Sequence, residues 1–195
     1  MPTTDFDYND VTCIPKRDGR IRYVLKKPGD NIGKNPLFVI CLHSTTADED
    51  EHDPTVRRAM TIAEEKFKQF KRFDGFVMFN LYPLRIFPLR EGKLPTELPD
   101  TDEQKLLGKN IAAIKKELAN ANVTKPTIWA AWGGGIKKKP YLRECLREIV
   151  PDVEEATWLR FGDFTTDGHP RHPLYVKGDS KISEFKIKEY IAKLK

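Results

Sequence analysis

Four short apolar runs, separated by segments with helical features, most constrain what this chain can fold into. The runs cover residues 37–42, 75–81, 127–132 and 157–161 and are rich in β-branched and aromatic side chains. Runs of this length and composition are typical of strands that are buried on both faces of a sheet. Their alternation with helices predicts a three-layer α/β/α fold around a central, mostly parallel, four-stranded sheet.

Helices are predicted between and after these strands. Asp53 and Pro54 are suited to the N-cap and first position of a helix that runs to about residue 70, with Val56, Met60 and Ala63 on one face. Further helices are expected at residues 101–121, 141–149 and 183–194. A half-exposed strand is expected at residues 19–27, where basic and apolar residues alternate. The 195 residues suit one domain, residues 1–195, with this strand and the last helix packed on it.

The composition bears on where in the cell the protein is located. Its three cysteines are odd in number and widely spaced, which suits neither a disulfide framework nor a zinc site. No run approaches the ~20 apolar residues of a membrane span, and residues 1–10 lack the basic and apolar regions of a signal peptide. We therefore expect a cytoplasmic protein that has no membrane partner and is a monomer.

Basic residues are unevenly placed along a chain whose formal net charge is +5. One group lies within residues 16–27, and a second consists of Lys137, Lys138, Lys139, Arg143 and Arg147. Either group would attract a phosphate backbone. The alternative is that both are ordinary solvated surfaces.

The first candidate for a functional segment is residues 43–53, which follow a predicted buried strand. Ligands of parallel sheets bind beyond the carboxyl ends of the strands. Here Ser44 and Thr45 can offer backbone N–H groups to an anion, and His43 or a carboxylate can position a water molecule. A solvated loop with an N-cap is the alternative. A divalent cation held by the acidic residues and His52 is another.

The second candidate is residues 166–175, which contain Asp167, His169, Arg171, His172 and Tyr175. Two prolines stiffen this segment, which favours fixed positions for its side chains. Histidine is the usual proton-handling residue near neutral pH. A structural turn with surface histidines is the rival interpretation.

Two further features follow predicted strands. Asn80 ends the strand at residues 75–81, where its amide can read the edge of a base or satisfy local backbone groups. Trp132 precedes three glycines, residues 133–135, which allow a ligand to approach closely or simply form a turn. The glycines match neither a Walker loop nor a dinucleotide fingerprint.

In this order, these segments resemble the family of domain of unknown function 1643. The matching positions are residues 42–48, 53–58, 80–81, 132–133 and 167–175, and the likeness covers about residues 21–176. Two positions depart from the family pattern. His43 stands where the family has asparagine, and Ser44 stands where it has proline.

More distantly, the layout is similar to the uracil-DNA glycosylase superfamily. This resemblance places His43 at the water-activating position, with Asp48 and Asp53 as alternatives for that task. It places Asn80 at the base-reading position, and residues 169–171 in the final loop beside the leaving base. It also implies that the three-layer fold is uracil-DNA glycosylase-like.

The departure at His43 and the long segment at residues 81–99 favour a modified base as the target. The resemblance itself implies a monofunctional DNA N-glycosylase that flips the base out of double-stranded DNA and hydrolyses its N-glycosidic bond. It implies no metal and no organic cofactor, and antiviral defence against phages with modified DNA is a natural use. The expected catalytic residues are His43, Asp48, Asp53 and His169. The expected base-binding residues are Asn80, Tyr82, Trp132 and Tyr175. The expected phosphate-binding residues are Ser44, Thr45, Arg57, Arg58, Lys137, Lys138, Lys139, Arg171 and His172.

Three other functions stay open. A metal-dependent nuclease or phosphohydrolase would use Asp48, Asp50, His52 and Asp53. A non-catalytic nucleic-acid-binding domain would depend on residues 137–139 instead. A hydrolase of free modified nucleosides would not be inhibited by duplex DNA.

Overall fold

The structure is a computed structural model, and it describes residues 12–15, 21–28, 35–44, 54–70, 75–85, 94, 101–120 and 125–194. Its strands are β1 (Thr12–Ile14), β2 (Val24–Pro28), β3 (Leu37–His43), β4 (Gly75–Tyr82), β5 (Thr127–Ala130), β6 (Thr157–Phe161) and β7 (Ile182–Glu184). Its α-helices are α1 (Pro54–Phe70), α2 (Thr101–Asn120), α3 (Pro140–Ile149) and α4 (Ile187–Lys193). Three short 3₁₀ helices are η1 (Gly134–Lys138), η2 (Val150–Val153) and η3 (Pro173–Tyr175).

The strands form one seven-stranded mixed sheet in the order β1-β2-β4-β3-β5-β6-β7. The neighbours β4, β3, β5 and β6 pair in parallel, whereas β1, β2 and β7 pair antiparallel at the two sides. The prediction of four strands was therefore wrong in number. The strands β1 and β7 have only three residues each, which is too short for a periodic signal.

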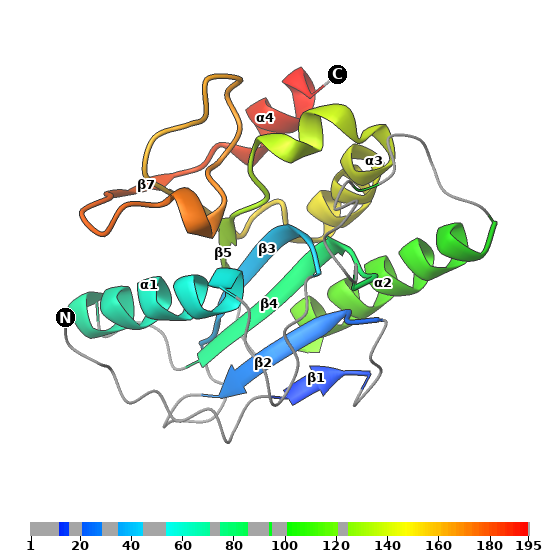
Figure 1. The fold of residues 1–195 in the computed structure, drawn as a ribbon, viewed down its shortest axis with the longest axis horizontal. Helices are drawn as coiled ribbons and strands as arrows, with labels where there is room; N and C mark the ends of the chain where they lie inside the picture. Colours follow the sequence, from blue (N-terminus) through cyan, green and yellow to red (C-terminus); the bar gives the residue numbers. More distant parts are fainter. Residues whose placement is uncertain are drawn as a thin grey trace.

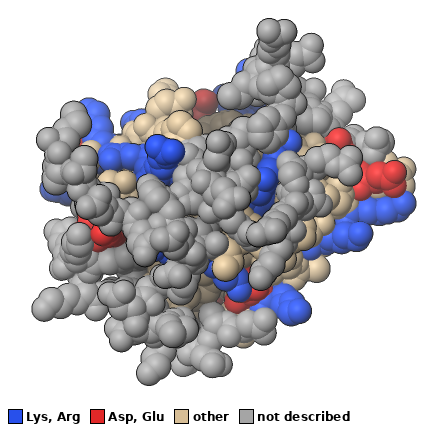
Figure 2. All heavy atoms as spheres, turned by 60° about the horizontal axis from the view of Figure 1, so that its bottom comes forward, with Lys and Arg blue, Asp and Glu red and all other residues tan. Residues whose placement is uncertain are grey.

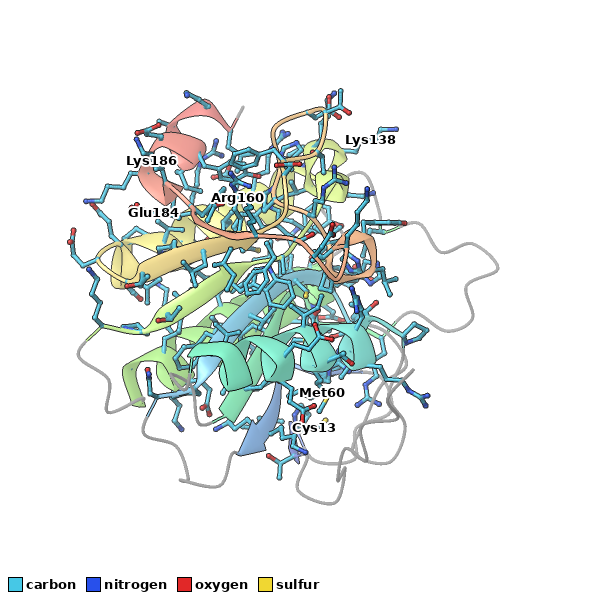
Figure 3. All side chains as sticks on the ribbon, turned by 90° about the vertical axis from the view of Figure 1, so that its left-hand side faces the viewer. Cys13, Met60, Lys138, Arg160, Glu184 and Lys186 are labelled. Atoms are coloured by element: carbon cyan, nitrogen blue, oxygen red, sulfur yellow. The ribbon has the colours of Figure 1, made fainter. Side chains whose placement is uncertain are left out.

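Helices cover both faces of the sheet, and Figure 1 shows α1 on one side and α2 on the other. On the α1 side, Val56, Met60 and Ala63 are buried against Val39 and Trp129, which confirms the predicted helix face. Cys13 belongs to the same cluster and is labelled with Met60 in Figure 3. Burial of each large apolar side chain contributes about 1.5–3 kcal/mol.

The second core cluster lies between the other face of the sheet and helices α2, α3 and α4. It includes Ile114 of α2, Leu142 and Leu146 of α3, and Ile187 at the start of α4. A pair of stacked rings, Phe38 and Phe79, lies on this face with centroids 5.8 Å apart. No helix in the described part of the chain has the length and apolar character needed to cross a membrane.

The two ends of the predicted domain differ from the expectation. The predicted terminal helix at residues 183–194 divides into β7 and the shorter α4, because residues 182–184 pair with β6 and extend the sheet. The strand expected at residues 19–27 begins only at Val24. Ile21 forms an isolated bridge with Leu84, and residues 16–20 lie outside the described part.

Candidate functional site

The strand order reverses direction at β3 and β5. The chain runs from β3 to its neighbour β4 and then to β5 on the opposite side of β3. In open α/β sheets, ligands bind in the crevice beyond the carboxyl ends of the strands at such a switch point. Here these ends carry His43 and Ser44 after β3, and Trp132 and the glycines at residues 133–135 after β5.

The three glycines lie in space between the end of β3 and the segment at residues 165–172. A Cβ atom on Gly135 would lie 2.6 Å from Cδ2 of Leu42 in β3. A Cβ atom on Gly134 would lie 4.0 Å from Cδ2 of His169, and one on Gly133 would lie 3.0 Å from Cβ of His172. The structure therefore brings the end of β3 and the predicted histidine segment to the same edge of the sheet.

His169 is buried and held at both its backbone and its ring. Its N–H donates to Oγ1 of Thr165 (3.1 Å), and its carbonyl accepts from the N–H of Thr165 (2.8 Å). Its Nδ1 lies 2.8 Å from the hydroxyl of Tyr190 on α4, and this hydroxyl accepts a hydrogen bond from Nε1 of Trp132 (2.9 Å). Among the described residues, the His169 ring has no other hydrogen bond.

Burial lowers the pKa of His169 below its ordinary value, although the nearby Asp167 carboxylate opposes this effect. Lys137 and Arg143 add to the lowering of the pKa because a second positive charge nearby disfavours the imidazolium. Asp167 accepts a hydrogen bond from Lys137 (2.9 Å), and this contact lowers the pKa of the carboxyl. The His169 ring is therefore neutral near pH 7.

His43 and Asn80 meet where β3 and β4 end. With its carboxamide oriented to satisfy both ends, Asn80 donates from Nδ2 to the carbonyl of His43 (2.8 Å). Its Oδ1 accepts from Nη2 of Arg22 (3.3 Å) and lies 3.2 Å from Oγ of Ser44. Asn80 is only 1% exposed, so its amide satisfies local groups, which was one of the two predicted roles.

The ring of His43 is half-buried, and its Nδ1 lies 3.2 Å from the carbonyl oxygen of Ser44. Because a carbonyl oxygen can only accept, Nδ1 carries a proton in this contact. Ser44 is fully buried, and its Oγ donates to the carbonyl of Arg22 (3.1 Å).

The aromatic side chains among the predicted base-binding residues differ in exposure. Tyr82 is buried and donates from its hydroxyl to Glu103 of α2 (2.9 Å). Trp132 is 1% exposed and packs against Trp158 and other rings. Tyr175, by contrast, is 70% exposed and leaves its ring open to a ligand.

The predicted phosphate-binding cations also separate into two kinds. Arg57 and Lys138 are exposed, and Lys137 is exposed but paired with Asp167. Arg58 donates from Nη2 to the carbonyl of Val176 (2.8 Å), which links α1 to the segment after η3. Figure 2 shows lysine and arginine side chains in separate groups on the face that it presents.

Three other predicted phosphate-binding residues have partial or full burial. Lys139 is buried and donates to the carbonyl of Leu94, and desolvation lowers its pKa. Arg171 is half-buried. His172 is also half-buried, and its Nδ1 accepts from the N–H of Leu174 (3.4 Å) at the start of η3.

The remaining predicted site residues lie outside the described part of the chain. These are Thr45, Asp48 and Asp53, together with Asp50 and His52 of the nuclease alternative. Among the residues that are described, no group of three or more histidine, cysteine or acidic side chains is placed to hold a metal ion.

Two residues that hold His169, Tyr190 and Thr165, were not among the site residues predicted from the sequence. The only sequence signal for Tyr190 was its place in the amphipathic terminal segment, where an aromatic ring with a hydroxyl group can be buried and still hydrogen-bond. Its partner could not be inferred, because the contact spans 21 positions in sequence.

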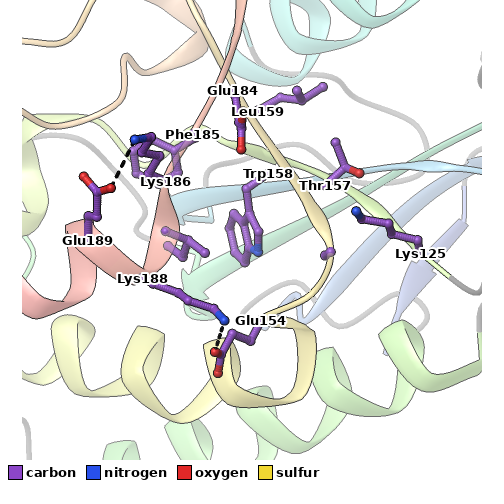
Figure 4. A pocket seen from close by; sticks show the side chains of 12 residues that line it. Lys125, Glu154, Thr157, Trp158, Leu159, Glu184, Phe185, Lys186, Lys188 and Glu189 are labelled. Atoms are coloured by element: carbon purple, nitrogen blue, oxygen red, sulfur yellow. Dashed lines mark ion pairs between the residues drawn. The ribbon is translucent and has the colours of Figure 1, made fainter.

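A hollow of about 520 Å³ lies elsewhere, beside β6, β7 and α4 (Figure 4). Lysines and glutamates surround Trp158 and Phe185 there, and Lys188 pairs with Glu154 in this region. Among the described residues, none of the predicted site residues lines it.

The fold and the edge of the sheet define an α/β protein with polar side chains gathered at a topological switch point. The family model described as "Protein of unknown function (DUF1643)" matches residues 22–174, and the chain belongs to this family. The resemblance to this family is thereby confirmed. Searches of curated proteins and of solved structures found no match.

Proposed function

We propose that the protein is a DNA glycosylase-like hydrolase that excises a modified base from DNA. The observation that supports this most is the neutral, buried His169 ring beside the glycines of the switch point. Its Nδ1 is engaged with Tyr190, which leaves Nε2 for a ligand. A neutral donor in a site with little water is suited to stabilise a departing anionic base.

The arrangement of the strands supports the uracil-DNA glycosylase-like architecture implied by the resemblance. Strands β4, β3, β5 and β6 are parallel, and helices cover both faces of the sheet. His43 ends β3, Asn80 lies near the end of β4, and His169 follows β6. These are the positions that the resemblance assigns to the water-activating, base-reading and final-loop residues.

In the proposed reaction, the bond between C1′ of the sugar and the base nitrogen breaks, and its electron pair leaves with the base. The oxygen of a water molecule forms the new bond to C1′, and its released proton passes to a general base. His43 is the described residue suited to this role, because a neutral ring that donates from Nδ1 to Ser44 has its lone pair on Nε2. Asp48 and Asp53 are the alternatives. A positioned base contributes typically ~10²–10⁴-fold.

His169 donates from Nε2 to an oxygen of the departing base as negative charge develops there. A neutral imidazole does this without a prior protonation step, which agrees with the low pKa of His169. The removal of a comparable donor in other enzymes costs about 10²–10³-fold in rate. Positive charge on Lys137 and Arg143 near the ring favours the anionic product, whereas the Asp167 carboxylate opposes it.

Recognition of the DNA requires the target base to leave the helix, at a cost of a few kcal/mol. Stacking on an aromatic ring contributes about 1–3 kcal/mol per base and can largely offset this cost. Tyr175 is the predicted base-binding residue with an exposed ring. The exposed Arg57 and Lys138 are suited to contact phosphates.

The test is incubation of the purified protein, in the presence of a chelator, with DNAs that contain ordinary, deaminated, hydroxymethylated or glucosylated bases. Alkali treatment reveals abasic sites, and mass spectrometry identifies the released base. We expect release of one class of base, and a loss of about 10²–10³-fold in His169→Ala. Lys115→Met, which removes a half-exposed lysine of α2 that pairs with Asp152, is the control and should release base at the wild-type rate.

Two outcomes would overturn this proposal. One is DNA binding without release of any base, which would favour a binding domain. The other is strand cleavage without abasic sites that stops when the chelator is added, which would favour the metal-dependent nuclease.

A further inference from the structure

Tyr190 belongs to α4, beyond the residues that the family model matches. Its ring lies within an aromatic cluster, with centroids 5.6 Å from Trp132, 5.1 Å from Phe185 and 5.9 Å from His169. Burial of this ring raises the pKa of the phenol to about 12, so the hydroxyl keeps its proton at neutral pH. The packing therefore holds one neutral hydroxyl group at a defined position next to His169.

The direction of each hydrogen bond at this hydroxyl follows from the chemistry of its partners. Trp132 Nε1 is only a donor, so the oxygen of Tyr190 accepts from it. Among the described residues, the one remaining partner of the Tyr190 hydroxyl is Nδ1 of His169, at 2.8 Å. The hydroxyl of Tyr190 can therefore donate only to Nδ1 among these partners. If Nδ1 carried a proton, the phenol proton would have no acceptor there.

We propose that Tyr190 is a positioning residue that fixes His169 in the tautomer with its proton on Nε2. Trp132 orients the hydroxyl, the hydroxyl donates to Nδ1, and Nε2–H points away from this chain of hydrogen bonds. The inference deepens the proposed function and rests on it for its catalytic meaning. In the other tautomer, Nε2 would present a lone pair to the leaving base and would repel its developing negative charge.

The first experiment measures the tautomer directly and needs no substrate. Long-range ¹H–¹⁵N NMR spectra of the imidazole rings distinguish a protonated from an unprotonated nitrogen, and His169→Gln identifies the signals of His169 among the four histidines. We expect the wild-type ring to carry its proton on Nε2. Tyr190→Phe should produce a mixture of tautomers, whereas Tyr141→Phe on α3 should not change the spectrum of His169.

The second experiment measures release of whichever base the wild-type protein excises. Tyr190→Phe should lower kcat roughly fivefold to tenfold, as expected for the loss of one orienting hydrogen bond, and should leave KM nearly unchanged. Tyr141→Phe should keep the wild-type kcat. A rise in KM alone, or an unchanged kcat despite a mixture of tautomers, would contradict the proposed role.

The two experiments separate the failure of this inference from the failure of the proposed function. A wild-type ring with its proton on Nδ1, or an unchanged tautomer in Tyr190→Phe, overturns the inference whatever the activity. The expected tautomers without base release from any DNA would support the role of Tyr190 and overturn only the glycosylase proposal. If Tyr190→Phe does not fold, the wild-type spectrum and that of Trp132→Phe, which removes the donor to the hydroxyl, still decide the question.

Discussion

At Gly133 the backbone turns with a φ of +72°, a conformation that other residues adopt at a cost, and a Cβ atom there would lie 3.0 Å from Cβ of His172. We expect Gly133→Ala to lower the free energy of unfolding by about 1–3 kcal/mol, because backbone strain and the close contact act together. It should also displace the histidine segment and reduce any base release. Denaturant unfolding followed by circular dichroism measures the first effect.

Gly108 on α2 provides the matched control, because a Cβ atom there has no heavy atom within 4 Å. The same substitution in a helix raises the free energy of unfolding by roughly 0.5–1 kcal/mol. Gly108→Ala should therefore stabilise the protein where Gly133→Ala destabilises it. Equal effects at the two positions would show that the turn at Gly133 does not depend on glycine.

At the scale of elements, the local sequence was sufficient to predict a helix or strand where its pattern of buried residues was strong. The apolar runs at residues 37–42, 75–81 and 157–161 correspond closely to β3, β4 and β6, and Pro54 begins α1 as its fixed φ predicts. The local sequence was insufficient where pairing with a strand elsewhere in the chain decides the secondary structure. Residues 182–184 are helical by local pattern, but they extend the sheet because the edge of β6 provides hydrogen-bonding partners.

The same limit applies to the candidate site. Polar residues at strand ends were predictable because parallel strands bring their carboxyl ends to one edge. The burial of Asn80 and Trp132 could not be predicted, since it depends on how neighbouring elements cover them. The contact of His169 with Tyr190 was equally inaccessible, because it requires α4 to be folded back beside the segment that follows β6.

The rates at which the buried cysteines react with a thiol reagent measure how readily individual elements open. Cys13, Cys41 and Cys145 are buried in β1, β3 and α3 and form no disulfide bond within the described part of the chain, and burial raises the pKa of the Cys145 thiol to about 12. We expect all three to react slowly with a thiol reagent in the native protein, because the reactive species is the thiolate. Cys13 should react first, since a three-residue edge strand opens more readily than the central β3.

Mass spectrometry of the peptides after timed modification measures these rates. Unfolding in denaturant should make the three thiols react alike, which serves as the control. Modification of Cys41 as fast as Cys13 would show that the sheet opens as a whole and not from its β1 edge.

For the whole molecule, His169 makes stability depend on pH. Its pKa is lower in the folded protein than the ordinary value of about 6.5, so the unfolded chain binds a proton at this ring more readily. The stability associated with the neutral ring is present above pH ~6.5 and is lost as the pH falls toward the folded pKa. Asp167 opposes this loss, while Lys137 and Arg143 increase it.

We therefore expect the free energy of unfolding of the wild-type protein to decrease more between pH 7 and pH 5 than that of His169→Asn. Urea unfolding at several pH values measures the difference between the two slopes. Lys115→Met should retain the wild-type slope. Parallel curves for the wild-type protein and His169→Asn would mean that His169 titrates alike in the folded and unfolded chains.

The contact between α4 and His169 also orders events during synthesis of the protein. The ribosome makes β3, β4 and β5 before α4, so the central strands can pair while later residues are still being added. The His169 ring acquires its hydroxyl partner only after synthesis has passed Tyr190. A nascent chain or a prematurely terminated product can thus contain every residue matched by the family model and still lack a correctly held histidine. Under the proposed glycosylase function, this order would keep incomplete chains inactive.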